Sequence, residues 1–147
     1  MSATLEQIFV AAKHGEPQTT RTDGELTAGV GLNGDRYAGT GVVSLIEAEA
    51  VEHFNTTTGL AIDAAECGRN LLTRGVELNP LVGKRFRIGD VEFEGTELCD
   101  PCATLGRQLA TAEVTAPQVV RAFTEKAGLR AKVLSNGSIK PGSTISF

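Results

Sequence analysis

The chain has 147 residues, of which 41% are hydrophobic and 22% are charged, and its formal net charge is −4. This is the balance of an ordinary globular protein, and its acidity argues against nucleic acid or an acidic membrane as the main partner, because both select for clustered positive charge. No apolar run approaches the roughly 18 residues of a membrane-spanning helix. The N-terminal segment lacks a basic region followed by an apolar core, so we expect a cytoplasmic protein without a signal peptide.

The first part of the chain predicts a strand followed by a glycine-rich segment. LEQIFVAA, residues 5–12, has the pattern of a strand, and a polar loop follows it. AGVGLNGDRYAGTG, residues 28–41, then contains five glycines in 14 residues. Glycine permits positive φ and close approach of the backbone to a ligand. This segment is either a set of tight turns between strands or a ligand-binding loop.

The middle of the chain predicts a strand, a helix and a second strand. VVSLI, 42–46, is a candidate buried strand, and 47–55 is rich in helix formers. The apolar side of this helix would consist of Ala48, Ala50, Val51 and Phe54. Gly59 is a stop signal that ends the helix. Residues 69–84 predict a short strand and then a polar turn containing proline.

The clearest strand signal is RFRIGDVEFEGTEL, residues 85–98. Apolar and charged residues alternate on both sides of Gly89-Asp90, which predicts a hairpin with one buried face and one solvated face. A second helix is predicted over 115–128, where Thr115 and Gln118 fit a capping box. The remaining residues predict two or three short strands, with Asn136-Gly137 as a hairpin turn.

These elements predict a β-rich, mixed α+β fold. Many short strands at turn-marked intervals favour a closed or nearly closed β-barrel, which also removes exposed strand edges. We expect two main helices, 47–55 and 115–128, together with short helical turns. No repeat or second core is visible, so residues 1–147 are expected to form a single domain.

The most informative motif is CDPC, residues 99–102, at the end of the predicted hairpin. A structural zinc site normally needs a second pair of ligands, and a thioredoxin-type dithiol normally lies in a βαβ context; the sequence offers neither. One cysteine could instead act as a nucleophilic or metal-binding thiolate. Burial as packing also remains open, because free cysteine is among the most buried residue types.

Basic residues that could bind an anionic ligand are the second feature of a candidate site. A ligand with a phosphate requires cations and backbone N–H groups. The alternative for each arginine alone is a solvated surface charge. The candidates are Arg36, Arg69, Arg107, Arg130 and Lys132.

Taken together, the chain resembles a small stand-alone MOSC domain, the module named after the C-terminal part of molybdenum cofactor sulfurase. The resemblance rests on an ordered set of segments that covers most of the chain. They are GLNGDRYAG (31–39), VSLIEAEAVE (43–52), RNLLTRGVELNPLVGKRFRIGDVEFEG (69–95), CDPC (99–102) and GLRAKVLSNGSIKPGSTI (128–145).

The resemblance implies a β-rich barrel-like fold that binds molybdenum cofactor, a pterin dithiolene with a phosphate tail. The family cysteine maps to Cys102, which is therefore the predicted metal ligand and catalytic residue, whereas Cys99 inherits no role. The predicted cofactor-binding residues, of which Arg130 is added for its charge, are Asp35, Arg36, Arg69, Asn70 and Arg130.

Two functions follow from the resemblance. The first is reduction of small N-oxygenated or N-hydroxylated compounds, with electrons from a separate protein, because the chain shows no iron–sulfur cysteine set and no flavin fingerprint. The alternative is a non-redox carrier that uses Cys102 to hold persulfide sulfur, or that delivers cofactor. It would need a separate pyridoxal-phosphate desulfurase. Whether the protein is an enzyme therefore stays open.

Overall fold

The computed structural model describes residues 3–13, 17–99 and 127–147. The predicted helix 115–128 and the residues Cys102 and Arg107 fall outside this description, apart from the last two residues of the helix range. In chain order the elements are β1 (Thr4–Val10), β2 (Thr19–Arg21), β3 (Gly24–Thr27), β4 (Gly31–Leu32), β5 (Val42–Glu47), α1 (Ala48–Thr58), a 3-10 turn (Ala64–Cys67), β6 (Leu71–Arg74), a second 3-10 turn (Asn79–Leu81), β7 (Arg85–Ile88), β8 (Val91–Leu98), β9 (Leu129–Val133), β10 (Gly137–Ile139) and β11 (Ile145–Ser146).

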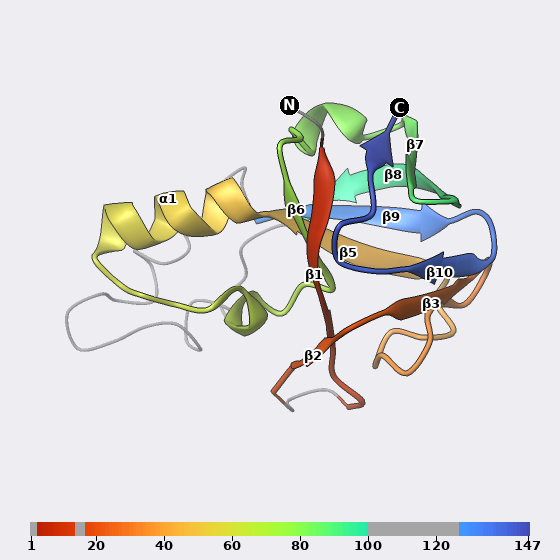
Figure 1. Ribbon diagram of the computed structural model, residues 1–147, viewed down its shortest axis with the longest axis horizontal. Coiled ribbons are helices and arrows are strands. Elements are labelled where there is room, and N and C mark those ends of the chain that lie inside the picture. Colours follow the sequence, from red (N-terminus) through yellow and green to blue (C-terminus); the bar gives the residue numbers. More distant parts are fainter. Residues whose placement is uncertain (1–2, 14–16, 100–126) are drawn as a thin grey trace.

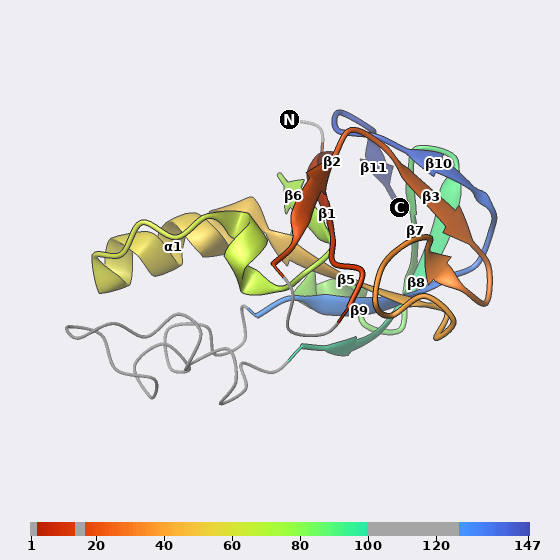
Figure 2. The ribbon, with the colours of Figure 1, turned by 90° about the horizontal axis from the view of Figure 1, so that it is seen from below.

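The fold is mostly β, and its main sheet curls strongly around one interior (Figure 1, Figure 2). The eight strands of this sheet follow the order β11-β7-β8-β9-β5-β6-β1-β2, and β10-β3-β4 form a smaller sheet. All pairs in the large sheet are antiparallel except β5 with β6, which are parallel and joined through α1. Parallel neighbours need such a crossover.

The prediction of a closed or nearly closed barrel is confirmed in part: the sheet is strongly curled, but it forms a half-barrel and is not closed. The free edge of β1 is divided between two short partners. Its second half pairs with β2, from Ile8 to Val10, and near its start the isolated bridge Thr4–Thr144 and three backbone hydrogen bonds join it to residues 142–145. Neither partner extends along the whole strand, so no continuous ladder closes the ring.

Two apolar clusters account for the burial pattern. The larger one fills the inside of the curl and includes Leu45, Phe86 and Phe93, each at most 2% exposed. The smaller one lies between α1 and the outer side of the sheet, where Phe54 packs with Phe9. Strands β1, β5 and β6 therefore contribute residues to both clusters.

The helix α1 confirms the prediction for 47–55 and extends it to Thr58. Its buried residues are the four predicted ones, and Gly59 ends it in the left-handed conformation with φ 74°. Within the described residues α1 is the one α-helix, where the sequence predicted two for the whole chain. No described helix is long and apolar enough to span a membrane.

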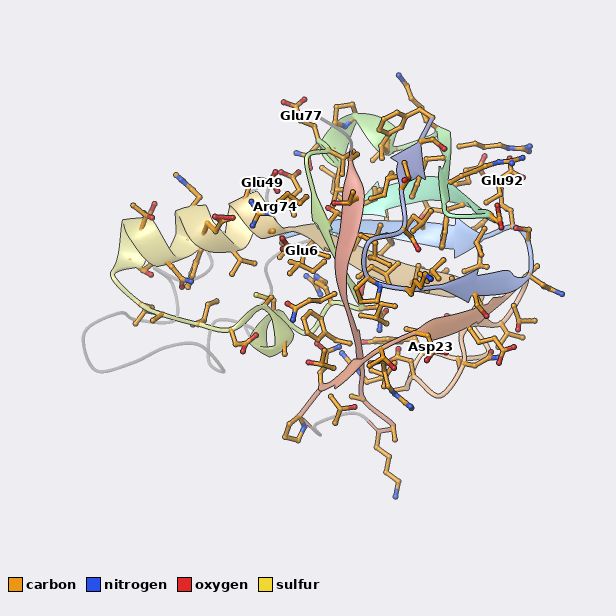
Figure 3. The ribbon with its side chains drawn as sticks, in the orientation of Figure 1. Glu6, Asp23, Glu49, Arg74, Glu77 and Glu92 are labelled. Atoms are coloured by element: carbon orange, nitrogen blue, oxygen red, sulfur yellow. The ribbon has the colours of Figure 1, made fainter. Side chains whose placement is uncertain are left out.

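An ion-pair cluster ties α1 to the sheet. Arg74 of β6 donates from Nε to Glu6 of β1 and from Nη2 to Glu52 of α1, each at 2.7 Å. The Glu49 carboxylate accepts the backbone N–H of Gly75 at 2.8 Å. Figure 3 shows Glu6, Glu49 and Arg74 gathered where the helix leaves the sheet.

The hairpin 85–98 is confirmed as β7 and β8, with Arg85 and Arg87 exposed and Phe86 and Ile88 buried. The Asn136-Gly137 hairpin is wrong. Strand β9 pairs with β5 and β8, whereas β10, which begins at Gly137, pairs with β3. Asn136 supplies a long-range contact instead, because its Oδ1 accepts the N–H of Ala28 at 2.8 Å.

Candidate functional site

A pocket of about 300 Å³ opens over strands β5, β8 and β9. The glycine-rich segment forms one wall, the residues just before β6 form another, and the end of β8 forms a third. Its lining residues are Tyr37, Thr40, Val42, Val43, Ser44, Gly68, Arg69, Asn70, Thr96, Glu97 and Arg130. Three residues predicted from sequence, Arg69, Asn70 and Arg130, thus lie around one cavity.

Arg69 is held at the pocket by a hydrogen bond to the backbone of the segment just before β9. Its Nε donates to the carbonyl oxygen of Ala127 at 2.8 Å. Gly128, next in the chain, has φ 119°, and a Cβ there would collide with the carbonyl oxygen of Leu45. Glycine is therefore required for the close packing of this turn against β5. The terminal nitrogens of Arg69 have no hydrogen-bond acceptor among the described residues.

Asn70 is a buried structural tie in the pocket wall. Its Oδ1 accepts the N–H and the hydroxyl of Ser44 at 3.1 and 3.3 Å, and its Nδ2 donates to the carbonyl oxygen of Phe9 at 3.2 Å. The residue is 1% exposed. The oxygen and the nitrogen of the amide therefore tie the residue before β6 to β5 and β1, respectively, and the side chain positions Arg69.

Arg130 forms an ion pair inside the pocket. Its Nη1 donates to Glu97 Oε1 at 2.9 Å, and the two side chains are 54% and 62% exposed. The hydrogen bond to Glu97 raises the pKa of Arg130, so this guanidinium stays charged. Thr96 Oγ1 donates to the Arg130 carbonyl oxygen at 3.1 Å, which links the same two strands.

Asp35 and Arg36 lie behind the pocket wall and do not line the cavity. The Asp35 carboxylate accepts the N–H of Ala11 and of Tyr37 at 3.1 and 3.2 Å. Arg36 donates from Nη2 to the Gly68 carbonyl oxygen at 3.1 Å, and its guanidinium lies 4.9 Å from the centre of the Tyr37 ring. Both residues therefore orient pocket-lining neighbours.

Arg36 also carries an unsatisfied group. Its Nη1 is buried without a hydrogen-bond partner among the described residues, and the carboxylate of Asp35 lies 3.8 Å away. A buried donor of this kind is costly unless something accepts its hydrogen bond. This nitrogen therefore has an opposite charge close by but no hydrogen-bond acceptor among the described residues.

Cys99, directly after β8, lies close to two residues of the pocket lining, Arg69 and Arg130. It is 3% exposed, and its N–H donates to the Gly128 carbonyl oxygen at 2.8 Å. Burial raises the pKa of the Cys99 thiol, while the nearby Arg69 and Arg130 oppose that rise. The thiol form is therefore favoured, although two cations lie close to the sulfur.

Sequence reasoning missed several residues that form the cavity, notably Tyr37, Ser44 and Glu97. Tyr37 directly follows Arg36, and Glu97 precedes Cys99 by two positions, so both adjoin predicted site segments. Cys102, the predicted metal ligand, lies outside the described residues. Among the residues that the structure describes, no cluster of three or more His, Cys, Asp or Glu side chains has the arrangement of a metal site.

The cavity has groups that can hold an anion, set among polar and apolar side chains. Two arginines contribute charge at the surface of the cavity, a third arginine lies directly behind it, and Ser44 and Thr40 add hydroxyl groups. Guanidinium groups match the geometry of phosphate and carboxylate oxygens. The single opposing charge in the lining is Glu97.

Comparison with solved structures supports this fold at low sequence identity. The YuaD protein of Bacillus subtilis is 18% identical, with a TM-score of 0.87, and the match covers 100% of this chain and 97% of that chain. YiiM from Geobacillus stearothermophilus is 15% identical with a TM-score of 0.76, covering 98% and 74%. YiiM from Escherichia coli is 19% identical with a TM-score of 0.70, covering 99% and 69%.

Identity this low establishes a shared fold and leaves activity open. A search of curated proteins found no match. The MOSC domain model, in contrast, matches residues 25–146, which includes the glycine-rich segment, every pocket-lining residue and both cysteines of the CDPC motif. The chain therefore belongs to the MOSC domain family.

Proposed function

We propose that the pocket over β5, β8 and β9 binds the phosphate-bearing end of molybdenum cofactor. The observation that carries this proposal is the convergence of Arg69 and Arg130, 61 positions apart in the sequence, on one cavity of about 300 Å³. This volume is at the lower end of the range for ligand pockets, which suits one end of a larger ligand. Arg36 lies behind the wall, where the Asp35 carboxylate offsets its charge and its buried Nη1 has no hydrogen-bond acceptor among the described residues.

The residues present fit such a ligand in chemical type. The terminal nitrogens of Arg69 have no acceptor among the described residues and Arg130 is partly exposed, so both can donate hydrogen bonds to a phosphate. The ring of Tyr37 would provide a flat apolar surface beside a pterin. Asp35 and Asn70 would act indirectly, because their polar atoms already bind the backbone of neighbouring segments.

Cys102 remains the proposed metal ligand. In the sequence it comes three positions after Cys99, which lies near the pocket arginines. When bound, the cofactor supplies a metal centre that exchanges electrons with a substrate. The proposed substrates are small N-oxygenated or N-hydroxylated compounds, and a separate protein provides the electrons.

Analysis of bound metal and pterin tests the proposal. The parent protein and three cysteine variants are purified from a host that makes the cofactor, and molybdenum and pterin are measured per chain. We expect both in the parent and in the control Cys67→Ser, and loss of molybdenum in Cys102→Ser. Metal that survives Cys102→Ser contradicts the ligand assignment. Absence of pterin and metal from the parent contradicts cofactor binding.

The third variant, Cys99→Ser, separates the two cysteines of the motif. Cys99 is buried against the sheet, so we expect the variant to keep metal and pterin. Arginine variants test the pocket itself: Arg69→Gln and Arg130→Gln should both lower the pterin content. The matched control is Arg85→Gln on β7, which removes an exposed arginine that does not line the pocket.

The second candidate function is a sulfur carrier, in which Cys102 accepts the terminal sulfur of a desulfurase persulfide and releases the donor thiolate. The observation that favours it is the pair of cations beside the neighbouring thiol of Cys99, because cations stabilise anionic sulfur. Incubation with a cysteine desulfurase and cysteine, followed by peptide mass spectrometry, should reveal one added sulfur on Cys102. A peptide that gains no sulfur contradicts this function.

A further inference from the structure

The pocket contains its own competing anion, the carboxylate of Glu97. It lines the same cavity as Arg69 and Arg130, and it is bonded to Arg130 at 2.9 Å. Both side chains are more than half exposed. An ion pair at such exposure contributes little to stability, because water screens it. Its position in a binding cavity therefore calls for an explanation other than folding.

The backbone directs Glu97 into this position. Along β8, Val91 and Phe93 point into the core, and uninterrupted alternation would bring Glu97 to the same face. The pairing of β8 with β9 shifts register between Gly95 and Glu97, and after the shift Glu97 is opposite Arg130. Such a bulge changes the direction of a side chain.

The bulge is fixed by close packing at Gly95. The N–H of Gly95 donates to Lys84 and its carbonyl oxygen accepts from Gly83, at 2.9 and 2.8 Å. A Cβ at this position would collide with the carbonyl oxygen of Leu81. The glutamate is thus presented to the pocket by a rigid backbone feature of the fold.

The two pocket arginines differ in what holds them. Arg69 is anchored through Nε to a backbone carbonyl, which leaves its charge uncompensated by described residues. Arg130 is neutralised by Glu97. A ligand anion can bind Arg69 directly, but it can bind Arg130 fully only by taking the place of the carboxylate.

We propose that Glu97 sets the anion affinity and charge selectivity of the pocket, as an internal counterion of Arg130 that the ligand displaces. The inference rests on the proposed function in so far as the ligand is a phosphate-bearing anion. A doubly charged phosphate monoester group can compensate both arginines after the carboxylate has left. A singly charged carboxylate ligand would only replace one monoanion by another, so the pocket favours the dianion.

Titration with inorganic phosphate tests this inference without any cofactor. Chemical shifts of the backbone amides are followed by nuclear magnetic resonance at constant ionic strength for the parent, Glu97→Gln and Glu92→Gln. The last variant is the matched control, because Glu92 lies on the same strand, carries the same charge and does not line the pocket. We expect Glu97→Gln to bind phosphate roughly fivefold more tightly than the parent, and Glu92→Gln to match the parent.

Two further variants make the result specific to the pair. Arg130→Gln should weaken phosphate binding, and Glu97→Gln should tighten it by a different factor in that background than in the parent, because Glu97 is then an unpaired carboxylate that repels the anion and no longer the counterion of Arg130. Equal tightening by Glu97→Gln and Glu92→Gln would overturn the inference, since that is a general charge effect. Equal affinity of Glu97→Gln and the parent, or no measurable binding by either, would overturn it too.

The titration and the cofactor analysis can fail independently. If Glu97→Gln tightens phosphate binding but the parent contains neither pterin nor metal, the role of Glu97 stands and the identity of the ligand is wrong. If the parent contains cofactor but Glu97→Gln does not alter phosphate binding, the cofactor proposal stands and the counterion role is wrong. Thermal melts of each variant show whether the fold is kept.

Discussion

Asn70 and Ser44 are joined by reciprocal hydrogen bonds that hold the pocket wall to the sheet. The N–H of Asn70 donates to the Ser44 carbonyl oxygen at 3.0 Å, and Asn70 Oδ1 accepts the Ser44 N–H at 3.1 Å. Arg69 is the adjacent residue in the chain, so this pairing fixes the position of the Arg69 backbone at the pocket. A buried amide thus connects packing to the candidate site.

Replacement of Asn70 by Ala should destabilise the protein by about 2–3 kcal/mol. The change leaves the Phe9 carbonyl without its Nδ2 donor and the Ser44 N–H without its acceptor, and unpaired buried groups carry a desolvation cost. The control is Asn136→Ala, which removes one exposed hydrogen bond to Ala28 and should cost about 0.5–1 kcal/mol. Urea denaturation measures both values. Equal losses for the two variants would contradict a special role for Asn70.

Gly128→Ala should be more damaging than a typical glycine substitution. Its φ of 119° is unfavourable for alanine, and the new Cβ would collide with the Leu45 carbonyl oxygen. We expect a loss of about 3 kcal/mol or more. Gly59→Ala is the control, because it also has positive φ but no atom within 4 Å of an added Cβ, and about 1 kcal/mol is expected there. The chemical midpoints of unfolding provide the comparison, and similar midpoints would rule out the steric argument.

We expect the ion pairs of Arg74, which attach α1 to the sheet, to make a salt-dependent contribution to the free energy of unfolding. Arg74→Ala removes ion pairs to Glu6 and Glu52, both partly exposed, so we expect a loss of only about 0.5–1 kcal/mol at low salt. High salt should reduce this difference, because screening weakens exposed pairs. The control Arg85→Ala removes an arginine that makes no ion pair with described residues. If salt leaves the Arg74→Ala effect unchanged, packing of the side chain explains it instead.

Local patterns predicted the parts of the fold that depend on neighbours in sequence. The helix α1 was recognisable because its apolar residues recur at helical spacing before Gly59. The β7–β8 hairpin was recognisable because Phe86 and Phe93 alternate with charged residues, and the structure stacks these two rings at 5.5 Å. In both elements one face meets the core and the other meets water.

Strand pairing and pocket formation between segments far apart in the chain could not be predicted from local sequence patterns. Asn136-Gly137 has the chemistry of a hairpin turn, yet β10 pairs with β3, more than a hundred residues away. The pocket also depends on long-range contacts, since its lining comes from four separate segments of the chain. Glu97 was hidden for a further reason: the bulge after Gly95 breaks the alternation on which strand prediction depends.

The reactivity of Cys99 reports directly on the charges around the pocket. Burial raises the pKa of this thiol, Glu97 adds to the rise, and Arg69 and Arg130 oppose it. Alkylation requires the thiolate, so Cys99 in the native protein should react with iodoacetamide more slowly than the same cysteine in unfolded protein at neutral pH. Glu97→Gln should lower the pKa and speed the reaction, and Arg130→Gln should slow it. Peptide mass spectrometry assigns the rate to Cys99 alone.

The pH dependence of folding stability tests whether the pKa of Cys99 is raised. A thiol whose pKa is raised by folding favours the folded state below the pKa of the unfolded cysteine, near 9.0, and this advantage is lost as the pH rises beyond it. The difference in stability between the parent and Cys99→Ala should therefore decrease above pH 9. Glu92→Gln, which removes a distant charge on β8, should leave the alkylation rate unchanged. If it accelerated the reaction as much as Glu97→Gln does, the net charge of the protein, rather than the geometry of the Arg130–Glu97 pair, would control the thiol.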